Sequence, residues 1–145
     1  MDTKALVKKW KGHRRYTLKF VELIPEAQLT FKPIDGVRTY QSQLSHLTTW
    51  LRTHSRFVTG MTLEKPKTKT KADIQHYLTD FFDRLIFFLE ETDETALSEI
   101  VDVWYGNVSK ASILSTMDTH LSHHRGQLVV YLRLLGHKPP SFIGW

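Results

Sequence analysis

Residues 113–136 of this 145-residue chain read ILSTMDTHLSHHRGQLVVYLRLLG, and the spacing of their apolar side chains predicts one long amphipathic helix. Steps of three and four residues place these side chains on a single stripe: Ile113, Met117, His120, His124, Leu128, Tyr131 and Leu135. Two imidazole rings therefore lie on the face that we expect to be buried. Because residues four apart are neighbours on a helix, His120 and His124 can approach the same point in space.

Three more segments have helical periodicity: residues 3–24, 39–59 and 70–91. Pro25 ends the first segment, Gly60 follows the second, and Thr70 precedes the third as a candidate N-cap. The fourth helix is expected over residues 109–136. Four helices, with no convincing run of strands and no internal repeat, predict an all-α fold: a four-helix bundle that forms a single domain over residues 1–145.

The connections between these helices allow more than one topology. With frayed helix ends, residues 60–69 can span more than about 30 Å at about 3.3 Å per residue, which is the length of a twenty-residue helix. A crossover between the second and third helices is therefore allowed. Residues 92–98 are expected to add a short turn of helix. Residues 101–106 alternate apolar and polar side chains, which predicts an extended strap over one end of the bundle.

The segment 70–91 is apolar on more than one side, with phenylalanines at positions 81, 82, 87 and 88. A helix of this kind needs cover on two faces. The pattern predicts either a dimer interface or a central, well-packed helix of the bundle.

The composition excludes several classes of protein and of site. With 41% hydrophobic and 24% charged residues, the chain is an ordinary globular protein rather than a disordered one. It contains no cysteine, which excludes a disulfide framework, a thiolate zinc site, an iron–sulfur cluster and a cysteine nucleophile.

The charge pattern does not indicate a nucleic-acid partner. The net charge is a mild +5, and its densest segment, residues 65–71, alternates lysine with proline and threonine. This alternation is typical of a solvated loop, and it lacks the interleaved aromatic residues of a nucleic-acid site.

No targeting or membrane-spanning segment is expected either. The first fifteen residues carry six lysines and arginines without an apolar stretch of signal-peptide length. The apolar run at residues 85–89 has five residues, against about twenty needed to cross a bilayer. We therefore expect a cytoplasmic protein that does not associate with a membrane.

Two interpretations are open for the histidine pair on the last helix. His120 and His124 are either core histidines satisfied by backbone carbonyls or by each other, or two ligands of one metal ion. Neutral imidazole binds zinc, nickel, copper and iron, and a bound cation offsets the desolvation of two ring nitrogens. A third ligand would come from a facing helix, because interaxial distances of about 8–10 Å let facing side chains meet.

Three histidines are candidates for this third ligand: His13, His46 and His54. His46 and His54 lie about 12 Å apart along one expected helix, so at most one of them can join the site. Periodicity does not choose between them, and His54 lies closer to the leucine stripe of that helix. A core or supporting position is expected for His13.

Two segments resemble those of a known family. Residues 120–128, with the sequence HLSHHRGQL, and the following residues up to Pro140 resemble the last helix and C-terminal end of the DinB family, also called YfiT-like metalloenzymes. Residues 38–47, RTYQSQLSHL, are similar to the second helix of that family, whose closing histidine is the first metal ligand. The resemblance covers essentially the whole chain, and its most specific part is the motif His-x-x-x-His-Arg-Gly-Gln.

The resemblance implies a divalent metal, nickel or zinc, held by His46, His120 and His124. It also implies a four-helix bundle with a crossover between the second and third helices, and a homodimer. Several family members are thiol-dependent transferases or isomerases. A position left open on such a metal could hold either a water that acts as the nucleophile of a hydrolase or a low-molecular-weight thiol. The resemblance favours the thiol, so the expected function is that of a metal-dependent transferase that uses such a thiol on a small-molecule substrate. The alternative is a noncatalytic, dimeric metal-binding protein of the stress response.

Other side chains are candidates for contact with a substrate: Trp50, Tyr105, Arg125 and Gln127. Trp50 follows His46 by one helical turn and is either a wall of the pocket or a core residue. Arg125 and Gln127 belong to the family motif. Their alternative roles are a surface ion pair for the arginine and, for the glutamine, a buried hydrogen bond to a neighbouring helix.

The sequence does not identify a general base. Candidates lie in the expected strap: Glu99, Asp102 and Tyr105. Asp118 lies two residues before His120 and should face away from the histidine pair. Tyr105 and Trp145 are candidates to close the mouth of the site.

Overall fold

The computed structural model describes residues 2–142 and consists mainly of helices. In chain order the elements are α1 (Thr3–Leu23), a short 3-10 helix (Glu26–Gln28), α2 (Tyr40–Thr59), α3 (Lys71–Glu91), α4 (Glu94–Ser98), β1 (Ile100–Val103), β2 (Gly106–Ser109) and α5 (Lys110–Leu134). The four long helices that periodicity predicts are all present, and the all-α class is confirmed. Within residues 2–142, no helix combines the length and the apolar character needed to cross a membrane.

Polar caps explain where the helices begin. A side-chain oxygen accepts a hydrogen bond from a free backbone N–H in the first turn of each long helix; the capping residues are Asp2, Thr39, Thr70 and Ser109. At the other end of α2, Gly60 has a φ of +70°, a left-handed conformation that glycine adopts without strain. Local sequence therefore determines most helix boundaries.

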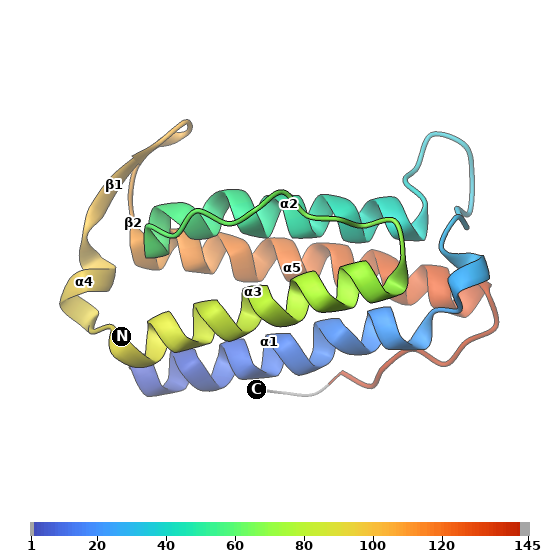
Figure 1. Cartoon of the computed structure of the whole chain (residues 1–145), viewed down its shortest axis with the longest axis horizontal. Coiled ribbons are helices and arrows are strands. Elements are labelled where there is room, and N and C mark those ends of the chain that lie inside the picture. The colour runs from blue at the N-terminus through green and yellow to red at the C-terminus, as the bar shows by residue number, and fades with distance from the viewer. Residues whose placement is uncertain (1, 143–145) are drawn as a thin grey trace.

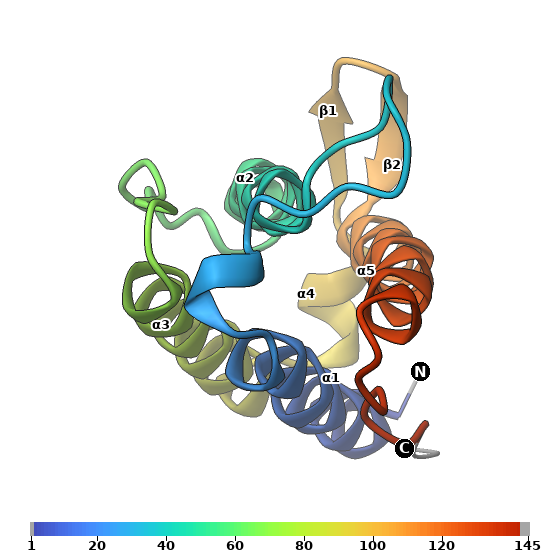
Figure 2. The ribbon, with the colours of Figure 1, turned by 90° about the vertical axis from the view of Figure 1, so that its right-hand side faces the viewer.

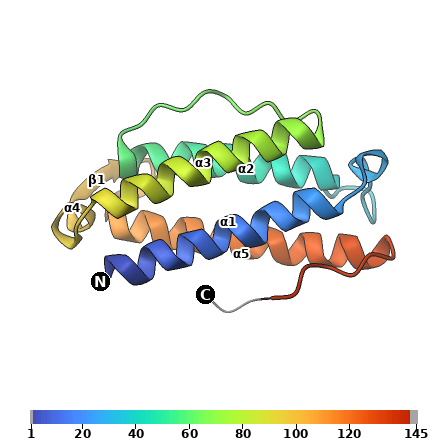
Figure 3. The same cartoon turned by 60° about the horizontal axis from the view of Figure 1, so that its bottom comes forward.

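The four long helices form a bundle in which α1 packs mainly against α3, and α2 against α5. Figure 2 shows these two pairs end-on, with α4 closing part of the far end. The chain between α2 and α3 returns along the length of the bundle, so α2 and α3 run in the same direction (Figures 1 and 3). This is the expected crossover. The side-chain amide of Gln41 holds it by donating to the carbonyls of Thr68 and Lys69, at 2.7 and 3.0 Å.

The core of the bundle contains apolar side chains from all four long helices. In α3 seven of them are buried: Ile74, Leu78, Phe81, Phe82, Leu85, Ile86 and Leu89. Contacts with both α1 and α2 cover this wide apolar face, so it belongs to a well-packed helix of the bundle. Phe87, which is 67% exposed, is the large apolar side chain that α3 leaves in solvent. The homodimer stays a prediction.

The region between α3 and α5 differs from the expectation of a single extended strap. Its short helix is present as α4, but the extended segment is one strand of an antiparallel hairpin in which Val101 pairs with Val108. The sequence contains no convincing strand signal here for two reasons. Each strand has four residues, and the turn consists of Trp104 and Tyr105 instead of the usual asparagine, aspartate or glycine.

One buried hydrogen bond joins the end of α1 to the start of α2. The hydroxyl of Tyr40, which is fully buried, donates to the carbonyl oxygen of Phe20 at 2.7 Å. Burial also raises the pKa of this hydroxyl, so it stays protonated as a donor.

We expect Tyr40→Phe to lower the free energy of unfolding by about 1–2 kcal/mol, because a buried carbonyl loses its partner. Tyr77→Phe is the matched control. The hydroxyl of Tyr77 donates to the carbonyl of Glu64 at an exposed position, so its loss should cost about 0.5 kcal/mol or less. Urea denaturation followed by circular dichroism measures both values, and equal losses would contradict the importance of burial.

Candidate metal centre

Three imidazole rings meet where α2 packs against α5. His46 comes from α2, and His120 and His124 come from α5. The centroid of the His46 ring lies 5.3 Å from that of His120 and 4.8 Å from that of His124, and the two α5 rings are 4.4 Å apart. One nitrogen of each ring lies within 4.8 Å of the other two. Two nitrogens bound to one ion are at most about 4.2 Å apart, so a small rotation of the rings brings all three into reach.

The environment of these rings favours the neutral form that binds metal ions. His124 is 4% exposed, and the other two rings are half-buried. Burial, together with the neighbouring histidines, lowers the pKa values of His120 and His124 to about 4. The pKa of His46 is also lowered, first by burial and then by the positive charge of Arg38. At neutral pH all three rings therefore carry lone pairs available to a cation.

One nitrogen of the cluster is buried without a partner. The Nε2 atom of His120 has no hydrogen bond to any group within residues 2–142. Leaving a buried polar atom unpaired costs free energy, and native proteins seldom tolerate it unless an ion or a water supplies the missing contact. A cation held among the three rings would fill this role, so the residues present fit a metal ion.

Two glutamines determine which nitrogen of His124 carries the proton. The Nδ1 atom lies 2.8 Å from Oε1 of Gln43 and 3.0 Å from Oε1 of Gln127. Because both oxygens are acceptors, Nδ1 must donate, which leaves the lone pair on Nε2. In metal sites such a bond fixes the orientation of the ring and strengthens it as a ligand. Gln127 therefore supports His124 within α5, whereas we expected either contact with a substrate or a hydrogen bond to a neighbouring helix.

Gln43 was not among the residues singled out from the sequence. It is buried on α2, and its amide nitrogen lies 3.4 Å from the hydroxyl of Tyr131, which in turn donates to the carbonyl of Arg38 at 2.7 Å. The available signal is its position three residues before His46, which places both side chains on neighbouring parts of one helical face.

The structure selects His46 over the other two candidates for a third ligand. The ring of His54 is separated from that of His120 by the indole of Trp50, which stacks on both of them. His54 donates its Nδ1 proton to the carbonyl of Trp50, at 2.9 Å. His13 lies in the core between α1 and α5, as expected, and its ring contacts Arg125 and Asp118 instead of the cluster.

Arg125 faces α1 although it follows His124 directly in the chain. Its guanidinium is 3% exposed and donates to Nδ1 of His13 at 3.0 Å and to the hydroxyl of Thr17 at 3.3 Å. Burial lowers its pKa to about 10, and the side chain is still charged at neutral pH. This geometry favours a role in joining two helices over contact with a substrate.

The remaining candidates lie at different distances from the cluster. Trp50 adjoins it directly, and Tyr105 lies at the hairpin turn, with its ring 6.1 Å from that of His54. Asp118 faces away, as expected, and binds Lys9 and His13. The two strap carboxylates, Glu99 and Asp102, lie at exposed positions, and Glu99 pairs with Lys110 at 2.5 Å. Trp145 lies outside the described residues.

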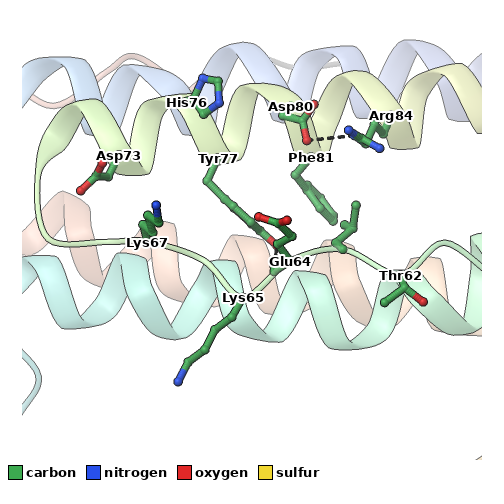
Figure 4. Close-up of a pocket in the computed structure, with 11 residues that line it drawn as sticks. Thr62, Glu64, Lys65, Lys67, Asp73, His76, Tyr77, Asp80, Phe81 and Arg84 are labelled. Carbon is green, nitrogen blue, oxygen red and sulfur yellow. Dashed lines mark hydrogen bonds and ion pairs between the residues drawn. The ribbon is translucent and has the colours of Figure 1, made fainter.

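A separate cavity of about 360 Å³ lies between α3 and the crossover segment (Figure 4). Its wall mixes acidic and basic side chains, and several of its polar groups already have partners. Arg84 pairs with Asp80 at 2.9 Å, and Tyr77 donates to the backbone of Glu64. None of the three clustered histidines lines this cavity, so it is distinct from the metal centre.

Comparison with known proteins agrees with this fold. The family model of the DinB family matches residues 1–144. The chain belongs to the DinB family. Within the family, it is 22% identical to the uncharacterized protein YjoA of Bacillus subtilis over 147 aligned positions, which cover 97% of this chain and 96% of YjoA.

Solved structures of similar proteins have the same fold. A DinB-like protein from Bacillus cereus superposes with a TM-score of 0.85 at 20% identity, covering 97% of each chain. The crystal structure of YjoA gives a TM-score of 0.77 at 21% identity, covering 95% of this chain and 96% of that one. A mutant of a mycothiol-dependent maleylpyruvate isomerase gives 0.64 at 14% identity, over 88% of this chain and 61% of the isomerase.

The contact between Gln43 and His124 predicts an effect on metal affinity. We expect Gln43→Leu to weaken Zn²⁺ binding by about tenfold, because His124 loses one of two acceptors that orient its ring. Gln41→Leu, on the same helix but bonded to the crossover, should leave the affinity unchanged. Competition with a chromophoric chelator measures both dissociation constants, and an unchanged value for Gln43→Leu would contradict the orienting role.

The buried position of Arg125 predicts an effect on stability. Arg125→Ala should lower the free energy of unfolding by about 2–4 kcal/mol, because His13 and Thr17 lose a buried donor. Arg133→Ala, at an exposed position of the same helix, should change it by about 0.5 kcal/mol or less. Guanidinium denaturation provides the comparison. A stability unchanged by Arg125→Ala would instead favour a role in substrate contact.

Proposed function

We propose that this protein is a metal-dependent enzyme that holds one divalent cation on His46, His120 and His124 and transfers a group with a low-molecular-weight thiol. The observation that carries the proposal is the convergence of three neutral imidazoles, one of them with a buried nitrogen that lacks a partner. Core histidines that satisfied one another would not leave this atom unpaired.

The number and type of ligands support a catalytic site. Structural zinc sites are closed by four protein ligands, whereas catalytic sites use three and leave a position for water or substrate. The cluster among residues 2–142 contains three ligating side chains, all imidazoles. Imidazole nitrogen suits zinc and nickel, and the absence of a carboxylate from the set disfavours magnesium and calcium.

The thiol must come from a separate molecule. The chain contains no cysteine, so it cannot supply a sulfur nucleophile of its own. When bound, a divalent cation would stabilise the thiolate, which is the nucleophilic form of a thiol. The positive charge of Arg38, which already lowers the pKa values of His46 and His124, would favour the same anion. One solved structure of the same fold is that of a mycothiol-dependent isomerase, which also supports a thiol.

The described side chains would position the reactants. The two glutamines keep His124 in the tautomer that leaves Nε2 for the cation, and Trp50 packs flat on His120 and restricts its rotation. The small-molecule electrophile would approach from the half-exposed side of the cluster, where His46 and His120 reach solvent.

Metal analysis tests the first part of the proposal. Untagged protein purified without metal resin should contain about one nickel or zinc ion per chain, and His120→Ala should lose it because two ligands hold an ion weakly. His76→Ala, which removes an exposed histidine of α3, is the control and should keep the ion. Wild-type protein that neither retains nor rebinds a divalent cation would contradict the metal site.

Thiol binding tests the second part. Addition of a small thiol to the Co²⁺-substituted protein should produce a thiolate-to-metal charge-transfer band, which His120→Ala should not show. Chelation would then abolish activity, and a divalent cation would restore it. If chelation lowered the melting temperature while no thiol reached the metal, the noncatalytic metal-binding alternative would be correct.

A further inference from the structure

We propose that a group of aromatic side chains beside the metal centre binds the planar aromatic part of an anionic substrate whose charged end reaches the metal. We call this group the aromatic wall; its members are Trp50, Phe57, Trp104 and Tyr105, and the buried ring of His54 packs behind them. The inference rests on the proposed function, because the cation and the wall would bind two parts of the same molecule.

The aromatic wall is continuous with the metal centre. The indole of Trp50 lies 3.9 Å from the ring of His120 with an interplanar angle of 6°, and 3.4 Å from the ring of His54 at 20°. Trp104 continues the series with its ring 4.9 Å from that of His54. A molecule that ligates the metal and extends along α2 toward the hairpin therefore meets aromatic side chains along this route.

The hairpin presents its two aromatic residues in a way that turn formation does not explain. Trp104 and Tyr105 form the connection between β1 and β2, where polar residues and glycine are usual. Trp104 is 63% exposed and Tyr105 is 46% exposed. Leaving this much apolar surface in water is unfavourable, and exposed aromatic groups of this kind mark binding surfaces. Figure 1 shows the hairpin at the end of the bundle where α2 ends and α5 begins, with its turn rising above the end of α2.

The charges around the wall favour an anionic ligand. The guanidinium of Arg56 lies 4.8 Å from the centroid of the Phe57 ring, which belongs to the wall. This guanidinium places a positive charge beside the wall, which favours an anionic ligand.

Two hydroxamates separate the contribution of the aromatic wall to affinity from that of the metal. Acetohydroxamate and 2-naphthohydroxamate ligate a metal through the same anionic group and differ in the planar ring. In the zinc-loaded protein, isothermal titration calorimetry should show that 2-naphthohydroxamate binds about tenfold more tightly, since stacking and apolar burial contribute to its affinity. Equal dissociation constants in the wild-type protein would overturn the inference.

Variants test whether the hairpin causes the tighter binding of the naphthyl compound. Trp104→Ala should lose most of the preference for the naphthyl compound while the affinity for acetohydroxamate stays unchanged. Phe87→Ala removes an aromatic side chain of similar exposure from α3 and should leave both affinities as they are. Arg38→Gln should weaken both compounds, because both bind as anions. A naphthyl preference that survives in Trp104→Ala would overturn the role of the hairpin.

The same titrations distinguish the failure of this inference from that of the proposed function. Acetohydroxamate reports on the open metal position alone. If it binds and the naphthyl group adds nothing, the metal centre stands and the aromatic wall is not a binding site. If neither compound binds to zinc-loaded protein, the open metal position is absent, and both the proposed function and this inference are wrong.

Discussion

The packing of α2 against α5 is the constraint on which the candidate site depends. Neither helix carries enough ligands by itself, and the cluster forms only because His46 lies opposite the two imidazoles of α5. The contact is fixed by more than apolar burial. Gln43 and Tyr131 connect the two helices by polar contacts, one of which ends on the ring of His124. A slip of one residue between the helices would break these contacts and separate the rings at the same time.

The helix α5 carries buried polar groups on two of its faces. One face holds His120 and His124. The other face directs Arg125 toward His13 of α1, and the ring of His13 also contacts Asp118 of α5. Buried charge is tolerated when it is paired, and these contacts also determine how α5 is rotated relative to α1. The adjacent histidine and arginine of the motif therefore point in different directions: His124 toward the candidate metal centre, and Arg125 toward the core.

The helices and the site differ in how well the sequence predicts them. Helix positions follow from caps and from apolar periodicity, which are local, so the expected ranges agree closely with the observed ones. The hairpin was missed because its strands are short and its turn contains two aromatic residues, a choice that the neighbouring rings of α2 explain better than turn chemistry does. Gln43 was missed because its position three residues before His46 does not by itself show that it contacts His124 on another helix.

The sequence alone determined the four long helices, the placement of His120 and His124 on one face, and the absence of a sulfur nucleophile, because each depends on neighbouring residues or on composition. The family resemblance then pointed to His46. Only the tertiary structure showed that His46 lies beside the α5 pair while Trp50 separates His54 from it. The rotation of one helix against another decides this, and helical periodicity within a single segment carries no information about that rotation.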